Sequence, residues 1–189
     1  MSSERFRPSV TVAAIVERDG RYLLVEEHTP EGLRLNNPAG HLDPNESPLQ
    51  GVVRETLEET ARHFEASALV GVYLARLQRP GAGRLPSLAL PSGAVPGVGI
   101  GAARQTAGED VSYLRFAFCG TVGEPEPGRR LDHGIVRTLW LTPQELQASA
   151  ARHRSPLVWR CIADHLAGRR YPLELVSTDA SVYAPALRR

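Results

Sequence analysis

Three carboxylates gathered in one short stretch, Glu55, Glu58 and Glu59, are the side chains of this 189-residue sequence best suited to chemistry. The stretch has helical character, and residues three and four apart on a helix are surface neighbours, so the glutamates are expected to share one face. Like charges crowded in this way repel one another and destabilise a bare helix. A hard divalent cation relieves the repulsion, because it takes carboxylate oxygens as ligands. The spacing therefore predicts a metal site, although a solvated acidic face is the ordinary explanation for three glutamates.

The helix that carries these carboxylates has a clear start signal. Ser47 supplies an N-cap hydroxyl, Pro48 suits the first helical position, and Gln50 can complete a capping box. An apolar stripe, expected to pack on the core with the glutamates roughly opposite, comprises Leu49, Val53, Leu57 and Phe64, with Thr56 and Thr60 at its edge. Gly51 lies one turn before Glu55 on the acidic face, where the missing side chain would leave room for a metal ion or a phosphate.

The wider spacing of the charged residues resembles the Nudix box, G-x5-E-x7-R-E-U-x-E-E-x-G-U, where U is a bulky aliphatic residue. The agreeing positions are Gly40, Glu46, Arg54, Glu55, Glu58 and Glu59. Three positions depart from the pattern, since Thr56 and Arg62 replace aliphatic residues and Ala61 replaces the second glycine. No departure removes a carboxylate, so the resemblance predicts an active enzyme.

The alanine at position 61 also bears on where the helix ends. A glycine in its place would end the helix in a left-handed conformation, which alanine disfavours. We therefore predict that the helix continues past Ala61 to about His63 or Phe64.

Beyond the box, the chain resembles the NudJ-type phosphatases of the Nudix superfamily over nearly its whole length. The resembling segments are residues 10–13, 25–27, 37–42, 114–116, 146–149, 154–158 and 170–174. The resemblance implies an α/β fold, a Nudix-like α/β/α sandwich with a mixed β-sheet. It also implies hydrolysis of nucleoside tri- and diphosphates with release of inorganic phosphate, and action on the diphosphate of hydroxymethylpyrimidine, a thiamin precursor.

The same resemblance implies a metal-dependent mechanism. A di- or triphosphate repels an attacking anion, so the reaction needs cations that bridge phosphate oxygens and align the substrate with water. Two or three Mg2+ ions, with Mn2+ as an alternative, are expected on Glu55, Glu58 and Glu59, and the backbone carbonyl of Gly40 is a further oxygen ligand by resemblance. Glu55 is also a candidate base, although the carboxylate that takes the proton differs within the superfamily.

Other charged residues are expected to support the metal ligands. Arg54 should pair with a glutamate of the box and fix its rotamer, and Glu46 should support the loop without binding metal. Asp132 matches an acidic position in the family and is a candidate further metal ligand. Its neighbour His133 is expected to be exposed to solvent.

Substrate contacts are expected from residues near the box. Asn37 and His41 flank the catalytic loop and could meet a base or a phosphate, although each could equally be a turn residue that bonds its own backbone. Glu26 and Glu27 close a strand that points at the site. Alternation allows only one of the two to face it, with Glu27 the candidate, and a solvated edge is the simpler explanation for the pair.

The rest of the chain alternates between strand and helix patterns. Strands are expected at residues 10–16, 22–25, 68–77, 111–122 and 135–141, with an Asp19-Gly20 hairpin turn between the first two. One helix should begin at Thr142 and Pro143, and a last helix over 156–167 should turn four apolar residues to the core: Leu157, Cys161, Ile162 and Leu166. Strands on both sides of a central helix suggest a mixed sheet between helical layers.

A Gly/Pro-rich insertion spans residues 79–108 and departs from the family. It holds seven glycines and four prolines with only three charges, and it interrupts a strand pair next to the site. Two readings are open, a tolerated flexible insertion and a substrate lid. Residues 97–101 superficially suggest a phosphate loop, but they lack the strand and helix that such a loop requires.

Composition fits a single domain over residues 1–189. The net charge of +1 predicts no affinity for nucleic acid or membranes, and no apolar run is long enough to span a bilayer. Cys119 and Cys161 are expected to be buried and reduced. A cytoplasmic protein that acts on small phosphorylated molecules, as a monomer or weak homodimer, is the expectation.

Two other functional classes stay open. A Nudix pyrophosphohydrolase acting on ADP-ribose or a nucleoside triphosphate would release a nucleoside monophosphate or pyrophosphate in place of orthophosphate. A nucleotide-sensing module without turnover is the lesser alternative, because all three glutamates of the box are present.

Overall fold

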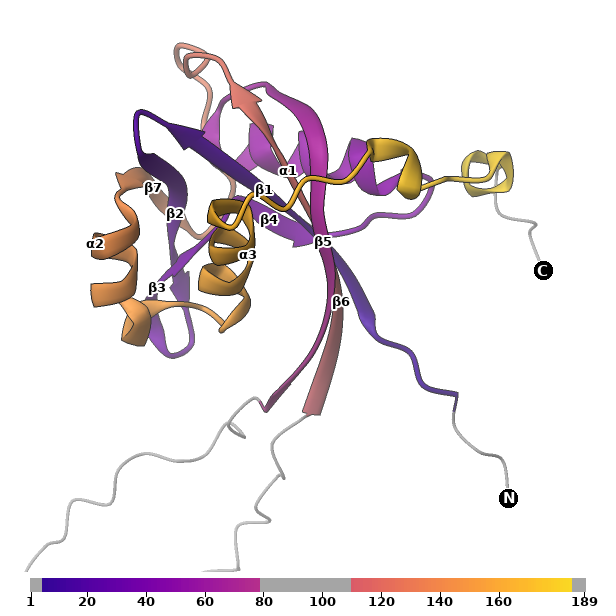
Figure 1. The fold of residues 1–189 in the computed structure, drawn as a ribbon, viewed down its shortest axis with the longest axis horizontal. Helices are drawn as coiled ribbons and strands as arrows, with labels where there is room; N and C mark the ends of the chain where they lie inside the picture. The colour runs from indigo at the N-terminus through magenta and orange to yellow at the C-terminus, as the bar shows by residue number, and fades with distance from the viewer. Residues whose placement is uncertain (1–4, 79–109, 185–189) are drawn as a thin grey trace, which may run out of the picture.

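The computed structural model describes residues 5–78 and 110–184, and within them seven strands form one mixed sheet (Figure 1). The strands are β1 (Ser9–Arg18), β2 (Arg21–Thr29), β3 (Gly32–Asn36), β4 (Ala39–His41), β5 (Phe64–Gln78), β6 (Asp110–Val122) and β7 (Ile135–Leu141). Their order is β3-β2-β1-β6-β5, while β4 pairs with β1 and β7 pairs with β2. The β1–β6 pair is parallel and the others are antiparallel, so the predicted mixed sheet is confirmed.

Helices cover both faces of the sheet. They are α1 (Pro48–Thr60), α2 (Pro143–Ala148) and α3 (Leu157–Leu166). A short 3-10 turn at Ala150–Arg152 lies between α2 and α3, and two more, at Leu173–Leu175 and Ala180–Tyr183, follow α3. Neighbouring side chains on a strand point to opposite faces. In β1, Val12, Ala14 and Val16 accordingly pack in one buried cluster with Val52 of α1, while Ile15 packs in a second cluster with residues of α2 and α3. The predicted α/β/α sandwich is confirmed, with α1 on the far side of the sheet in Figure 1 and α3 on the near side.

The local start and turn signals are confirmed. Ser47 and Gln50 form a complete capping box at the start of α1, and Thr142 caps α2 in the same way. Asp19 and Gly20 take left-handed φ angles of 51° and 75° in the turn between β1 and β2. These features are predictable because they depend on residues only a few positions apart.

The predicted continuation of α1 past Ala61 is wrong. Helix α1 ends at Thr60, and Ala61 takes φ 56° and ψ 25°, the left-handed conformation. Ala61 is buried, its N–H donates to Leu57 O at 2.9 Å, and its own carbonyl accepts from Glu126 N–H at 2.7 Å. These contacts hold the chain in the turn that leads into β5, so tertiary structure overrides the preference of alanine.

Replacing Ala61 with glycine is expected to stabilise the fold by about 1 kcal/mol, because glycine adopts the left-handed conformation without the Cβ clash. Thermal unfolding would measure the change as a raised melting temperature. Ala148→Gly at the end of α2 is the matched control, and it should lower stability by about 0.5–1 kcal/mol. A lower melting temperature for Ala61→Gly would contradict the explanation of the helix end.

The buried face of α1 also differs from the predicted stripe. The buried residues are Gly51, Val52, Glu55, Thr56, Glu59 and Thr60. Leu49, expected in the core, is 38% exposed. Thr56 and Thr60 can lie in the interior because their hydroxyl groups donate hydrogen bonds within the helix. Thr56 donates to Val52 O at 2.7 Å and Thr60 donates to Thr56 O at 2.6 Å. Two glutamates of the box therefore lie on the buried side of the helix, facing the sheet.

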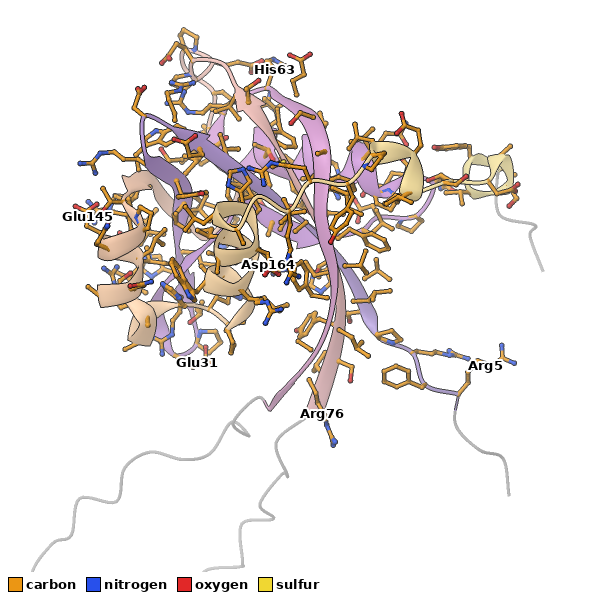
Figure 2. All side chains as sticks on the ribbon, viewed as in Figure 1. Arg5, Glu31, His63, Arg76, Glu145 and Asp164 are labelled. Carbon is orange, nitrogen blue, oxygen red and sulfur yellow. The ribbon has the colours of Figure 1, made fainter. Side chains whose placement is uncertain are left out.

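The remaining elements largely follow expectation. Cys119 and Cys161 are buried free thiols, as predicted. Leu166 is exposed at the end of α3, so its predicted place in the core is wrong. The pairing of β5 with β6 extends to Gln78 and Asp110, and Arg76, labelled in Figure 2, lies near this end of the pair. This pairing confirms that the insertion interrupts a strand pair. The insertion itself lies outside the described residues, so both interpretations of it, a flexible insertion and a substrate lid, concern residues that the structure does not describe. No helix in the described part of the chain is long and apolar enough to cross a membrane.

Candidate active site

The site forms where α1 packs over the short strand β4. Glu59 accepts a hydrogen bond at 2.8 Å from the backbone N–H of Ala39, the first residue of β4. The carboxyl group of Glu55 lies directly against Gly40. A Cβ atom added at Gly40 would fall 2.1 Å from the Glu55 carboxyl carbon, so only glycine allows this approach. The first glycine of the box is therefore required by the contact between β4 and α1.

Burial gives the two inward glutamates an unusual electrostatic state. Glu55 is 9% exposed and Glu59 is 7% exposed. Burial raises the pKa of Glu55, Arg54 opposes that rise, and the charges of Glu58 and Asp132 add to it. Burial also raises the pKa of Glu59 well above its usual value, with the Ala39 N–H opposing and the Glu55 charge adding to the rise. The pair would be stabilised as carboxylates by a cation.

Arg54 donates hydrogen bonds to three carboxylates at once. Its guanidinium contacts both oxygens of Glu46, at 3.0 and 2.7 Å, and donates to Glu55 at 2.8 Å and to Glu58 at 3.0 Å. It also donates to the carbonyl oxygen of His41 at 3.0 Å. The hydrogen bond with Glu46 is the main cause of its raised pKa. The expected pairing of Arg54 with box glutamates is thus present, and it fixes the Glu55 side chain against β4.

The expected role of Gly51 is wrong. A Cβ atom at this position would meet Glu46 Oε1 at 2.9 Å and a Leu42 methyl group at 3.0 Å. The missing side chain makes room for Glu46, which also accepts from the Asp43 N–H at 2.7 Å, and not for a metal ion or a phosphate. Glu46 therefore braces the loop before α1, in keeping with the expected supporting role.

Glu58 and Asp132 lie at the outer edge of the site. Glu58 is 40% exposed at its side chain, and its backbone carbonyl accepts a hydrogen bond from the Asp132 N–H at 2.9 Å. This bond ties the segment before β7 to α1, and the Asp132 charge reaches both Glu55 and Glu59. His133 is exposed, as expected. Asp132 is brought to the carboxylates, and its role as a ligand stays a prediction.

The donor set fits a divalent cation by its chemistry. Carboxylate and carbonyl oxygens are the ligands that Mg2+ and Mn2+ favour. Among the described residues no three acidic, histidine or cysteine side chains are gathered as a finished cation site, and Arg54 instead binds Glu55 and Glu58. The residues that would hold the ion are Glu55, Glu58 and Glu59, with the Gly40 carbonyl.

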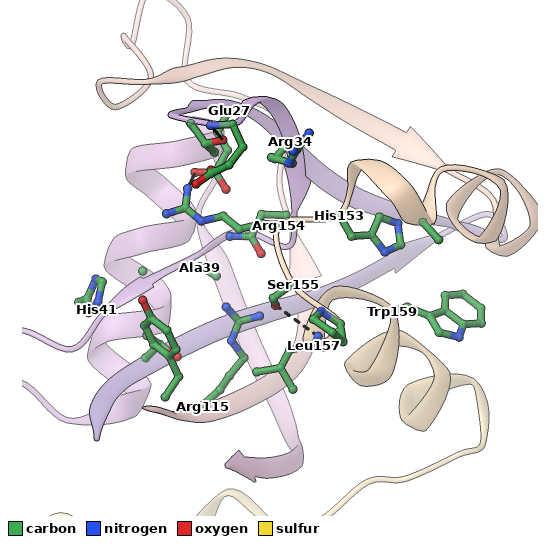
Figure 3. A pocket seen from close by; sticks show the side chains of 18 of the residues that line it. Glu27, Arg34, Ala39, His41, Arg115, His153, Arg154, Ser155, Leu157 and Trp159 are labelled. Carbon is green, nitrogen blue, oxygen red and sulfur yellow. Dashed lines mark hydrogen bonds and ion pairs between the residues drawn. The ribbon is translucent and has the colours of Figure 1, made fainter. Parts of the chain in front are cut away.

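A pocket opens beside β4 (Figure 3). Its volume is about 1440 Å3, above the roughly 300–1,000 Å3 of sites for drug-sized ligands, so size alone excludes no nucleotide. Ala39, Gly40 and His41 form the part of its wall nearest the buried glutamates. Glu55, Glu58 and Glu59 do not line the pocket themselves, so β4 is the link between the pocket and the carboxylates.

Two of the three predicted substrate residues line this pocket. His41 is in the wall, with its ring 6.2 Å from that of Tyr113. Glu27 is also in the wall, paired with Arg154. Asn37 is 1% exposed and does not line the pocket, so its predicted contact with substrate is not supported. The alternation along β3 and the following turn buries Asn37 while Asn36 faces the pocket.

The pair Glu26 and Glu27 does not form a solvated edge, so that interpretation is wrong. Glu26 is buried, with ion pairs to Arg137 of β7 and to Arg152. The Arg137 hydrogen bond is the main cause that lowers the pKa of Glu26. Burial raises the pKa of Glu27, and Arg154 opposes that rise. Alternation along β2 does send only one of the two to the pocket, as predicted.

Sequence reasoning missed the four arginines that line the pocket, Arg34, Arg76, Arg115 and Arg154. A signal was present for Arg115, since it is the one charged residue in the apolar run of residues 114–119. Arg34 and Arg154 carry no such signal, because β3 and the segment before α3 meet only in the folded chain.

The sheet topology and the buried glutamates of α1 define a class of protein. The NUDIX domain family matches residues 5–160, and the chain belongs to the Nudix family. It is a hydrolase acting on phosphorus-containing anhydrides, in a family that generally uses divalent metals and small-molecule diphosphate substrates.

Individual relatives agree with this class. The chain is 30% identical over 171 residues to Phosphatase NudJ of Escherichia coli K12, across 90% of this chain and 92% of that protein. A NUDIX hydrolase structure from Nitrosomonas europaea is 40% identical, with a TM-score of 0.71, and the match covers 92% of this chain and 98% of that one. A MutT NUDIX hydrolase from Burkholderia pseudomallei, at 18% identity and a TM-score of 0.56, covers 84% of this chain and 98% of its own and shares the fold.

Proposed function

We propose that this protein is a Mg2+-dependent phosphatase that releases orthophosphate from nucleoside tri- and diphosphates and from hydroxymethylpyrimidine diphosphate, with Mn2+ as an alternative cation. The similarity to Phosphatase NudJ, which extends over 90% of the chain, supports the phosphatase class over other Nudix activities. In this proposal the chain is one catalytic domain, acts in the cytoplasm on small molecules, and is a monomer or weak homodimer.

The observation that carries the proposal is the buried carboxylate pair Glu55 and Glu59 against β4. Two acidic groups in an apolar setting cost stability unless a cation offsets their charge. Arg54 offsets Glu55, whereas within residues 5–78 and 110–184 the one hydrogen-bond donor to Glu59 is the neutral Ala39 N–H. The pair adjoins a pocket large enough for a nucleotide. A metal-dependent phosphate site explains both the burial and the position of these carboxylates.

Each residue has a distinct part in the proposed reaction. Bound cation supplies charge neutralisation on the phosphate oxygens and alignment of substrate with water. Glu55, with its raised pKa, accepts the proton of the attacking water. Arg54 holds the Glu55 carboxylate in place, and the Ala39 N–H holds Glu59. The water oxygen bonds to the terminal phosphorus, the bridging P–O bond breaks, and the remaining phosphate leaves with the organic group.

Product analysis separates this proposal from the other Nudix activities. The protein and Mg2+ would be incubated in 18O-labelled water with GTP, GDP, ADP-ribose and hydroxymethylpyrimidine diphosphate, and the products identified by mass. We expect labelled orthophosphate with stepwise loss from GTP. Pyrophosphate with GMP, or AMP from ADP-ribose as the dominant product, would instead identify a pyrophosphohydrolase. Nucleotide binding without turnover of any substrate would identify a sensing module.

A further inference from the structure

Arg115 is a buried cation without an ion-pair partner in the described residues. It projects from β6 into the pocket wall and is 8% exposed. Its Nε and Nη1 atoms have no hydrogen-bond partner within residues 5–78 and 110–184. Each unpaired donor in such a setting costs stability, and a charged one costs more than a neutral one. The burial of Arg115 is therefore unfavourable for the stability of the protein without a ligand.

The surroundings of Arg115 do not neutralise it. The neighbouring Cys161 thiol has its pKa raised to about 11 by burial, so it is uncharged near neutral pH. Arg154 is a second cation, whose charge is balanced by Glu27. Glu59 acts on Arg115 through its charge, without a salt bridge between the two. Burial, the main influence, lowers the pKa of Arg115.

Two further features beside Arg115 favour an anion. The Ser155 hydroxyl accepts from the Leu157 N–H at 3.3 Å, which leaves its own hydrogen available to donate. Ser155 and Leu157 line the pocket where the ten-residue helix α3 begins, so the positive end of the helix dipole faces it. Figure 3 shows the Arg115 side chain directed toward Ser155. A guanidinium, a hydroxyl and a helix N-terminus thus meet on one wall.

We propose that Arg115, Ser155 and the start of α3 form an anion subsite that binds the phosphate group remaining on the organic part of the substrate. This assignment rests on the proposed function, since it treats the pocket as the place where a nucleoside di- or triphosphate is held. The same pocket is lined by Ala39 and Gly40, the residues of β4 that Glu59 and Glu55 contact. The subsite neutralises the non-transferred phosphate, while the carboxylate side of β4 takes the phosphate that is released.

Metal-free binding of a product tests the subsite independently of catalysis. In chelator, isothermal titration would compare GMP with guanosine, which lacks the phosphate group. We expect the parent protein to prefer GMP, and Arg115→Met to lower GMP affinity by about 10- to 100-fold, the loss of a charge-assisted hydrogen bond. Arg115→Lys, which keeps the charge, should bind with intermediate affinity. Arg169→Met, at an exposed arginine outside the pocket, should bind as the parent does.

Thermal unfolding provides a second readout, because a purely structural role of Arg115 would change the melting temperature in the opposite direction. Without ligand, Arg115→Met should melt at a higher temperature than the parent, because it removes an unpaired buried charge. A lower melting temperature, GMP affinity within twofold of the parent, or no preference of the parent for GMP over guanosine would each overturn the subsite. Because no turnover is needed, these outcomes are distinct from failure of the proposed function, which Glu59→Gln and product analysis test.

Discussion

Glu59→Gln is expected to lower the rate of diphosphate hydrolysis by on the order of 10^3-fold. The substitution removes one charge from the proposed ligand set while keeping nearly the same shape. Steady-state release of orthophosphate from GDP with saturating Mg2+ would measure the loss. A parent-like rate on every diphosphate tested would remove Glu59 from the mechanism.

Folding should survive this change, because the glutamine oxygen can still accept the Ala39 N–H bond that Glu59 accepts. The raised pKa of Glu59 means that its charge destabilises the metal-free fold above the unfolded-state pKa, so at neutral pH a neutral glutamine relieves that cost. In chelator the variant should therefore melt no lower than the parent. Glu65→Gln, at an exposed glutamate of β5, is the matched control and should leave the rate unchanged.

Gly40→Ala is expected to lower the hydrolysis rate by about 10^2-fold or more, because displacement of a reacting group by about 1 Å costs this much. The added methyl group would overlap the Glu55 carboxyl at 2.1 Å, so either the glutamate or β4 must move. Overpacking of this kind also costs roughly 1–3 kcal/mol of stability. Rate and melting temperature would be measured on the same preparation.

Gly123→Ala is the control for this second substitution. A Cβ atom at Gly123 meets nothing within 4 Å, so both the rate and the melting temperature should stay close to those of the parent. Full activity of Gly40→Ala would show that the contact between β4 and Glu55 is not needed for turnover.

The local features of the fold could be predicted from sequence because few residues decide them. The capping box of Ser47 and Gln50 and the Asp19-Gly20 turn each depend on a span of four residues or fewer. The mixed sheet followed from the order of strand and helix patterns together with the family resemblance. The carboxylate cluster was visible because its members are close in the chain.

Features that depend on distant contacts could not be predicted. The end of α1 is set at Ala61 by a bond from Glu126, far along the chain. The prediction of which face of α1 is buried was wrong because hydropathy counts Glu55 and Glu59 as exposed. In the folded chain, β4 and Arg54 provide the partners that allow their burial. The pocket wall brings together β2, β3, β6 and the start of α3, and no pattern along the sequence predicts that meeting.

The cation dependence of orthophosphate release from GDP, followed by 31P NMR, tests the metal-dependent mechanism most directly. Protein freed of metal by chelator should release no orthophosphate above the uncatalysed rate, and added Mg2+ should restore release in a saturable way. Glu59→Gln should stay near the uncatalysed rate across the same Mg2+ titration. Hydrolysis by the chelated parent at the full Mg2+-supported rate would contradict the metal-dependent mechanism.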